Sequence, residues 1–171
     1  MNTSDYLALI KKRLAANFDS KEDQILLKEK LDLLAKSHVK NEKYFAVKNV
    51  KLWSYDNNEY CLFKVLSHNI ERSHIRDFEN YLKKTVKELV VNPTGEHFQT
   101  IITGVLLTNG KIALEACTEV EKFKYNRSLA WGFKGYCFIR LILVDLKKEQ
   151  LFVNKRAKEV MKFYRPNEKK I

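Results

Sequence analysis

The chain has 171 residues, of which 45% are hydrophobic and 12% are aromatic. This length predicts one domain, residues 1–171, and this composition supplies enough apolar side chains for a core, so global disorder is excluded. Five glycines and two prolines are too few for a collagen-like chain or a flexible linker. The longest uncharged run covers the 14 residues from His97 to Gly110, whereas a membrane helix needs about 20 apolar residues. No membrane span is therefore predicted.

The net charge of +11 is concentrated at one end of the chain. Residues 1–121 carry a net charge of +1, and residues 122–171 carry +10. Such asymmetry is typical of proteins that meet nucleic acid, another polyanion or an acidic partner. The alternative is a basic surface that only keeps the protein soluble.

Two amphipathic helices are predicted at the N-terminus. Apolar residues three and four apart predict a helix over residues 4–18. The segment Ser20–Asp23 resembles a capping box and predicts the start of a second helix. The apolar faces of the two helices contain Leu7, Ile10, Leu14, Leu27, Leu31 and Leu34. Together they predict a helical hairpin, as a subdomain of residues 1–40 ahead of an α+β core of residues 41–171.

A strand pair and a long helix are predicted next. Residues 44–55 and 59–66 are rich in aromatic and β-branched residues, which is typical of strands. Asp56, Asn57 and Asn58 between them tolerate the backbone conformations of a tight turn. Residues 70–91 return to helical spacing.

The second half of the chain alternates strands and helices. The uncharged residues 97–108 predict a central strand, followed by a tight turn at Asn109–Gly110. The remaining predicted elements are a helix over residues 113–123, a strand over 136–145, a return strand over 151–153 and a last helix over 155–164, capped by Asn154 and ended by Pro166.

These elements predict an α+β fold. Strand pairs joined by short turns favour a mainly antiparallel sheet of about five strands with helices on one face. The N-terminal helical hairpin precedes this sheet.

The segment from Lys122 to Tyr136 contains four basic residues, five aromatic residues and two glycines. Basic groups attract phosphates and aromatic faces stack on bases, so this pattern suits single-stranded nucleic acid. An ordinary amphipathic strand, with aromatic residues in the core and lysines outside, is the commoner origin of such a pattern. The candidate binding residues of this segment are Lys122, Lys124, Tyr125, Arg127, Trp131, Phe133 and Lys134.

The predicted last helix is also basic. Its four candidate binding residues are Lys155, Arg156, Lys158 and Lys162, against one acid, Glu159. At 100° per residue, Lys155, Lys158 and Lys162 share a face that could contact phosphates or an anionic bilayer. A solvated helix face is an equally good interpretation.

Three functions are compatible with these patterns. The leading hypothesis is a non-enzymatic binding protein with a nucleic-acid or other polyanion surface in its C-terminal third. The second is a protein-interaction or self-associating domain, a homodimer included, that uses the aromatic segment 131–136. The third is a metal-dependent nuclease, because Asp145-x-Lys147 after an apolar strand resembles the acid-x-Lys pattern of restriction-endonuclease-like proteins. A plain hairpin turn explains the same tripeptide.

No cofactor or metal site is predicted. His68, Glu71 and His74 are spaced by three residues, whereas zinc-binding helices usually place their ligands at i and i+4. No phosphate loop or dinucleotide fingerprint occurs. The three cysteines are far apart and form no C-x-x-C pair, which favours a reducing, cytoplasmic compartment.

Overall fold

The computed structural model describes residues 1–44, 51–90, 97–128 and 135–167. Within these ranges the helices are α1 (Thr3–Leu14), α2 (Arg72–Leu89) and α3 (Leu114–Lys122). The strands are β1 (Asp19–Leu26), β2 (Glu29–Tyr44), β3 (Lys51–Val65), β4 (His97–Thr108), β5 (Asn126–Ser128), β6 (Tyr136–Asp145) and β7 (Gln150–Val153). Two short 3-10 helices follow, η2 (Lys155–Ala157) and η3 (Met161–Tyr164).

The seven described strands form one mixed sheet in the order β1-β2-β3-β4-β6-β5, and β7 also pairs with β6. The pairs β3/β4 and β4/β6 are parallel, and the other pairs are antiparallel. The prediction of a mainly antiparallel sheet of about five strands is therefore wrong. The physical reason is that α2 lies between β3 and β4, and α3 between β4 and β6. Each helix carries the chain back across the sheet, so the next strand runs parallel to the previous one.

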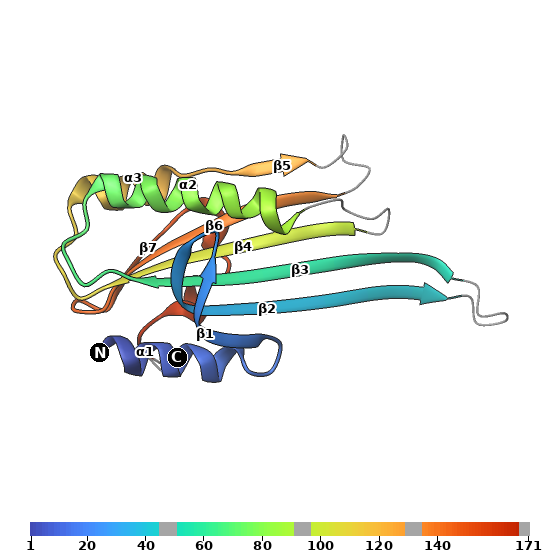
Figure 1. The fold of residues 1–171 in the computed structure, drawn as a ribbon, viewed down its shortest axis with the longest axis horizontal. Coiled ribbons are helices and arrows are strands. Elements are labelled where there is room, and N and C mark those ends of the chain that lie inside the picture. Colours follow the sequence, from blue (N-terminus) through green and yellow to red (C-terminus); the bar gives the residue numbers. More distant parts are fainter. Residues whose placement is uncertain (45–50, 91–96, 129–134, 168–171) are drawn as a thin grey trace.

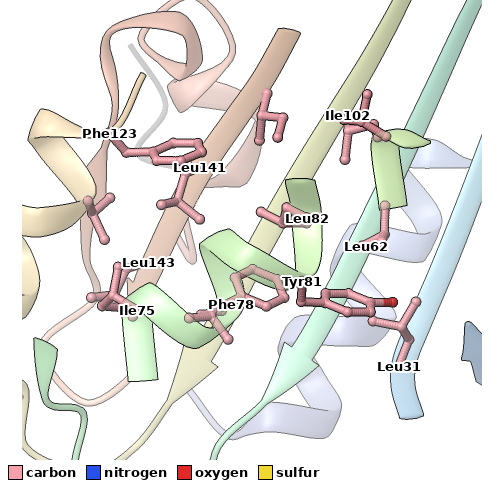
Figure 2. Packing of buried hydrophobic residues seen from close by; sticks show 14 of the residues in the cluster. Leu31, Leu62, Ile75, Phe78, Tyr81, Leu82, Ile102, Phe123, Leu141 and Leu143 are labelled. Atoms are coloured by element: carbon pink, nitrogen blue, oxygen red, sulfur yellow. The ribbon is translucent and has the colours of Figure 1, made fainter. Parts of the chain in front are cut away.

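Helices cover both faces of the sheet, not one as predicted (Figure 1). On one face, α2 and α3 pack against apolar side chains of the central strands, as Figure 2 shows for Phe78 and Leu82. On the other face, Tyr6, Ile10 and Leu14 of α1 pack against the sheet together with the C-terminal 3-10 helices. We call these the α2 face and the α1 face.

Gly104 of β4 allows α2 to approach the sheet closely. A Cβ atom at this position would lie 2.4 Å from Leu82 Cδ1 and 3.0 Å from Phe78 Cε1. The α2 face is thus packed without space for one more methyl group here.

The predicted second helix is wrong, because residues 19–44 form strands β1 and β2. A two-residue turn joins them, with φ of 53° at Leu27 and 68° at Lys28. Leu31 packs on the α2 face but Leu33 on the α1 face, whereas a regular strand would point both residues the same way. The strand therefore changes face between them. This irregularity produces the spacing of Leu27, Leu31 and Leu34 that imitates a helix.

Two further predictions are wrong. The supposed turn at Asp56–Asn58 lies inside β3, where these residues pair with residues 38–40 of β2. The predicted last helix is broken into η2, a turn and η3. Like charges three and four residues apart, at Lys155, Lys158 and Lys162, weaken an α-helix in this segment.

The other elements are confirmed. The first helix exists as α1, although it ends at Leu14. Predicted helices over residues 70–91 and 113–123 correspond to α2 and α3. The strand over 97–108 is β4 and lies between β3 and β6. The strand over 136–145 is β6, and its return strand is β7.

Candidate functional site

The edge of the sheet along β6 is interrupted in its middle. β5 pairs with the first residues of β6, Tyr136–Phe138, and β7 pairs with the last, Ile142–Asp145. Between these two short strands the side chain of Asn154 takes the place of a pairing strand.

Asn154 is buried and uses both ends of its amide. Its Oδ1 accepts hydrogen bonds from the N–H groups of Leu141 and Ala157, each at 3.1 Å. Its Nδ2 donates to the carbonyl oxygens of Phe123 at 3.3 Å and Ile139 at 3.1 Å. The predicted cap of the last helix is confirmed in this wider form, because Asn154 ties residue 123, β6 and η2 together.

A cleft of about 420 Å³ opens beside Asn154. One wall is formed by residues 123–126 and the other by η2 and the turn after it. Its charged and aromatic lining residues are Phe123, Lys124, Tyr125, Lys155, Arg156 and Glu159. Two basic segments that are about 30 residues apart in the sequence therefore meet at one cleft.

Arg156 is held beside the cleft by an aromatic ring. Its guanidinium carbon lies 4.7 Å from the centroid of the Phe138 ring, and Phe138 is buried. Such a cation–π contact uses the face of the guanidinium and leaves its N–H edges available. Arg156 is thereby ordered without losing its ability to bind an anion.

Arg140 lies under the cleft and is only 7% exposed. Its Nη1 donates to Glu59 Oε1 at 2.7 Å, and its Nη2 donates to Glu159 Oε1 at 2.7 Å. Burial raises the pKa of the Glu59 carboxyl, and the nearby Arg140 opposes this effect. Glu159 is the one acid that lines the cleft, against the three cations Lys124, Lys155 and Arg156, so the net charge that faces the cleft is positive.

The structure brings together four of the predicted binding residues: Lys124, Tyr125, Lys155 and Arg156. The exposed Lys122 lies at the end of α3, and the exposed Lys158 and Lys162 belong to the C-terminal turns; none of them lines the cleft.

Arg127 is also exposed and is not part of the cleft. It pairs with Cys137 in β6, and Cys137 packs on the α2 face. Trp131, Phe133 and Lys134, together with most of the segment 131–136, lie outside the described residues.

Asp145 closes the turn between β6 and β7. It is 3% exposed, and its Oδ1 accepts a hydrogen bond of 2.9 Å from the N–H of Lys148. Lys147 is exposed in the same turn. Within residues 1–44, 51–90, 97–128 and 135–167, no group of three His, Cys, Asp or Glu side chains is arranged to hold a metal ion. Asp145 and Lys147 thus lie in a hairpin turn, the alternative explanation of this tripeptide.

Sequence reasoning missed the residues under the cleft, Glu59, Phe138 and Arg140. One signal for them was present, because Arg140 is a single charge inside the apolar strand Tyr136–Val144. A charge in such a strand needs a partner when buried, but the sequence does not identify the partner.

In the described part of the chain, no helix is long and apolar enough to cross a membrane. No curated protein and no solved structure matches the chain significantly. The model of a family described as "Domain of unknown function (DUF8052)" matches residues 2–166. The match covers nearly the whole chain, and the protein belongs to this family.

Proposed function

We propose that the protein is a non-enzymatic binding protein that holds a polyanion, specifically single-stranded nucleic acid, in the cleft beside Asn154. The observation that carries the proposal is the meeting of Lys124, Lys155 and Arg156 at this cleft. Three cations in one cleft attract phosphate groups and release their counterions, which is the main source of affinity in nucleic-acid binding.

The dimensions of the cleft favour a single strand over a duplex. Ligand sites of 300–1,000 Å³ hold small molecules, and a cleft of about 420 Å³ is of the size that one nucleotide needs. Tyr125 is partly exposed at this cleft and offers a ring on which a base can stack. Lys122, close by in the chain and exposed, can contact the phosphates that leave the cleft.

The first test is the salt dependence of binding, measured by fluorescence anisotropy with a labelled 16-nucleotide single-stranded RNA. If three cations contact phosphates, the affinity should fall about 20-fold between 50 and 200 mM salt. A duplex of the same length should bind more weakly. Failure of both nucleic acids to bind at 50 mM salt would contradict the proposal.

The second test compares two charge-reversal variants of equal net charge. The triple variant Lys124→Glu, Lys155→Glu, Arg156→Glu changes the cleft and should lose the RNA at all salt concentrations. The control variant Lys87→Glu, Lys111→Glu, Lys147→Glu changes three exposed lysines elsewhere and should stay within about twofold of the wild type. Equal losses in both variants would show that overall charge, not the cleft, binds the RNA. Thermal unfolding of each variant checks that it folds.

We also propose that the protein works in the reducing environment of the cytoplasm. Cys61, Cys117 and Cys137 are all free and buried, as is typical of chains that do not need disulfides. Mass spectrometry of the native protein after rapid alkylation of cell extracts should find all three as thiols. A disulfide at any of them would overturn this proposal.

A further inference from the structure

A second cavity, of about 500 Å³, lies far from the β6 edge, between α2 and the β1–β2 turn. The residues that α2 contributes include His74, Asp77, Tyr81 and Lys84, which recur along one flank of the helix. The opposite flank, with Arg72 and Arg76, is bound to Glu119 of α3. The cavity follows the helix for about 15 Å, the rise expected for ten residues.

The cavity reaches the carboxyl ends of the parallel strands β3 and β4, where Lys64, Leu66 and Leu106 line it. The loop after β3 and the loop after β4 are joined by hydrogen bonds near His68. Thr108 Oγ1 donates to the His68 carbonyl oxygen at 3.2 Å, and the Lys111 N–H donates to Asn69 Oδ1 at 2.9 Å. A Cβ atom on Gly110 would lie 2.5 Å from the same His68 oxygen, so glycine is required at this close approach.

Hydrogen-bond donors predominate among the polar groups of the cavity. His74 Nδ1 accepts a hydrogen bond of 3.0 Å from the Glu71 N–H, so the proton of the neutral ring lies on Nε2, which can donate to a ligand. The His68 ring centroid lies 4.7 Å from that of His74. Lys84 makes no hydrogen bond or ion pair with another described residue, and it supplies a further donor.

The acidic groups of the cavity do not cancel these donors. Lys64 Nζ forms an ion pair of 2.5 Å with Glu29. Asp77 is the remaining carboxylate in the lining. Lys84 and Asp77 balance in charge, and the Nε2–H of His74 adds a neutral donor, so the lining offers an anionic group hydrogen bonds from His74 and Lys84 and not an excess of positive charge.

The apolar residues that line the cavity are Leu27, Leu66, Phe78 and Leu106. Leu27 is held at a φ of 53° in the β1–β2 turn, a region that costs a residue other than glycine or asparagine about 1–2 kcal/mol. Two-residue turns with both φ angles positive strongly prefer Asn-Gly. A leucine kept in such a conformation at the mouth of a cavity points to a role in that cavity.

We propose that this cavity binds a small aromatic anion, a molecule with one aromatic ring and one carboxylate or phosphate group. The ring packs on Leu27 and Phe78, and the anionic group accepts hydrogen bonds from His74 and Lys84. This site is separate from the nucleic-acid cleft and does not depend on it.

The test is isothermal titration of the full chain with four probes: phenyl phosphate, benzoate, inorganic phosphate and phenol. At least one of the two aromatic anions should bind saturably, and about tenfold more tightly than inorganic phosphate or phenol, because only the aromatic anions meet both parts of the site. Preference for phenyl phosphate or for benzoate identifies the anionic group. The proposal is overturned if neither aromatic anion binds saturably.

Two turn variants separate a binding role of Leu27 from a structural one. Leu27→Asn should keep or raise the melting temperature, because asparagine suits a positive φ, and should weaken binding about tenfold. Lys28→Gly relaxes the neighbouring position, which does not line the cavity, and should raise the melting temperature without changing the affinity. Lys84→Ala should also weaken binding about tenfold. Unchanged affinity in both Leu27→Asn and Lys84→Ala would place the ligand elsewhere and overturn the proposal.

Discussion

The two faces of the sheet bury different kinds of side chain, although the same strands form both. On the α2 face, the middle of the sheet presents Ile102 and Ile139, which belong to the apolar cluster that packs under α2. On the α1 face, the neighbouring residues Thr103 and Arg140 bond with Glu59. The middle strands thus present apolar side chains to α2 on one face, whereas on the other face they contain an ion pair that is largely removed from water.

The polar groups of the α1 face bear on the proposed nucleic-acid cleft. A buried arginine is tolerated only if its charge is compensated, and Arg140 achieves this with Glu59 and Glu159. The guanidinium carbon of Arg140 lies 5.4 Å from the centroid of the Phe138 ring, and Arg156 contacts the same ring. The polar half of the α1 face therefore lies beneath the proposed nucleic-acid cleft.

Among the variants that test this difference between the two faces, Arg140→Ala should have the largest effect on stability. We expect the variant to lose about 4 kcal/mol of unfolding free energy at pH 7, because Glu59 is left partly buried without its cation. Since the pKa of Glu59 is already raised by burial, protonation relieves the unpaired charge, and the loss should shrink as the pH falls below the raised pKa. Urea unfolding at several pH values measures this. A loss that does not depend on pH would mean that packing, not charge, is the cause.

Asn154→Ala should have the next largest effect, about 3 kcal/mol. The change leaves the buried groups of Phe123, Ile139 and Leu141 without their side-chain partner, at a cost of roughly 1 kcal/mol each. Asn126→Ala, at an exposed asparagine of the same cleft, is the matched control and should change stability by less than about 0.5 kcal/mol. Equal stability of the two variants would show that Asn154 does not hold the edge together.

Gly104→Ala tests the apolar face, with an expected loss of about 2 kcal/mol from overpacking. The new methyl group would displace the Leu82 side chain, whose Cδ2 lies 2.8 Å from the Cβ position. The loss should be the same at pH 5 and pH 7, since no titratable group lies in this contact. In a Leu82→Ala background the same change should cost much less. A loss that is equal in both backgrounds would place the strain elsewhere.

Glu159→Ala should have the smallest effect, below about 1 kcal/mol. Its side chain is 61% exposed, and exposed ion pairs contribute little to stability. Arg140 keeps its bond to Glu59, so the buried charge stays compensated. Because a negative charge is removed from the cleft, RNA should bind more tightly, which anisotropy can measure. Weaker RNA binding would argue that Glu159 positions Arg140 or Arg156 for the ligand.

The sequence predicted the elements with a regular apolar pattern. The spacing along α2 reports one face that packs on the core, the apolar runs of β4 and β6 report burial on both faces of the sheet, and these elements are confirmed. The β1–β2 hairpin was missed because its strand changes face between Leu31 and Leu33. Parallel pairing was missed, although the alternation of strands with helices over residues 59–145 indicates βαβ units and parallel strands.

The sequence also predicted part of the candidate site. Charge and aromatic content pointed to Lys124, Tyr125, Lys155 and Arg156, which meet at the cleft. They also pointed to Lys122, Arg127, Lys158 and Lys162, which do not line it. What separates the two groups is the bonding of Asn154 to the Phe123 carbonyl. Such a long-range contact of a single polar side chain leaves no trace in composition or periodicity.

The contact of α1 with the last turns of the chain has a consequence for folding during synthesis. Tyr6 donates its hydroxyl hydrogen to the Tyr164 carbonyl oxygen at 2.7 Å, and Arg13 Nη1 donates to the carbonyl oxygens of Phe163 and Arg165, each at 2.7 Å. A ribosome that adds 5–20 residues per second needs about 8–30 s to make the 150 residues between Arg13 and Phe163. During that interval, α1 is already synthesised but lacks its partners, and its apolar side must be shielded by the early strands or by a chaperone.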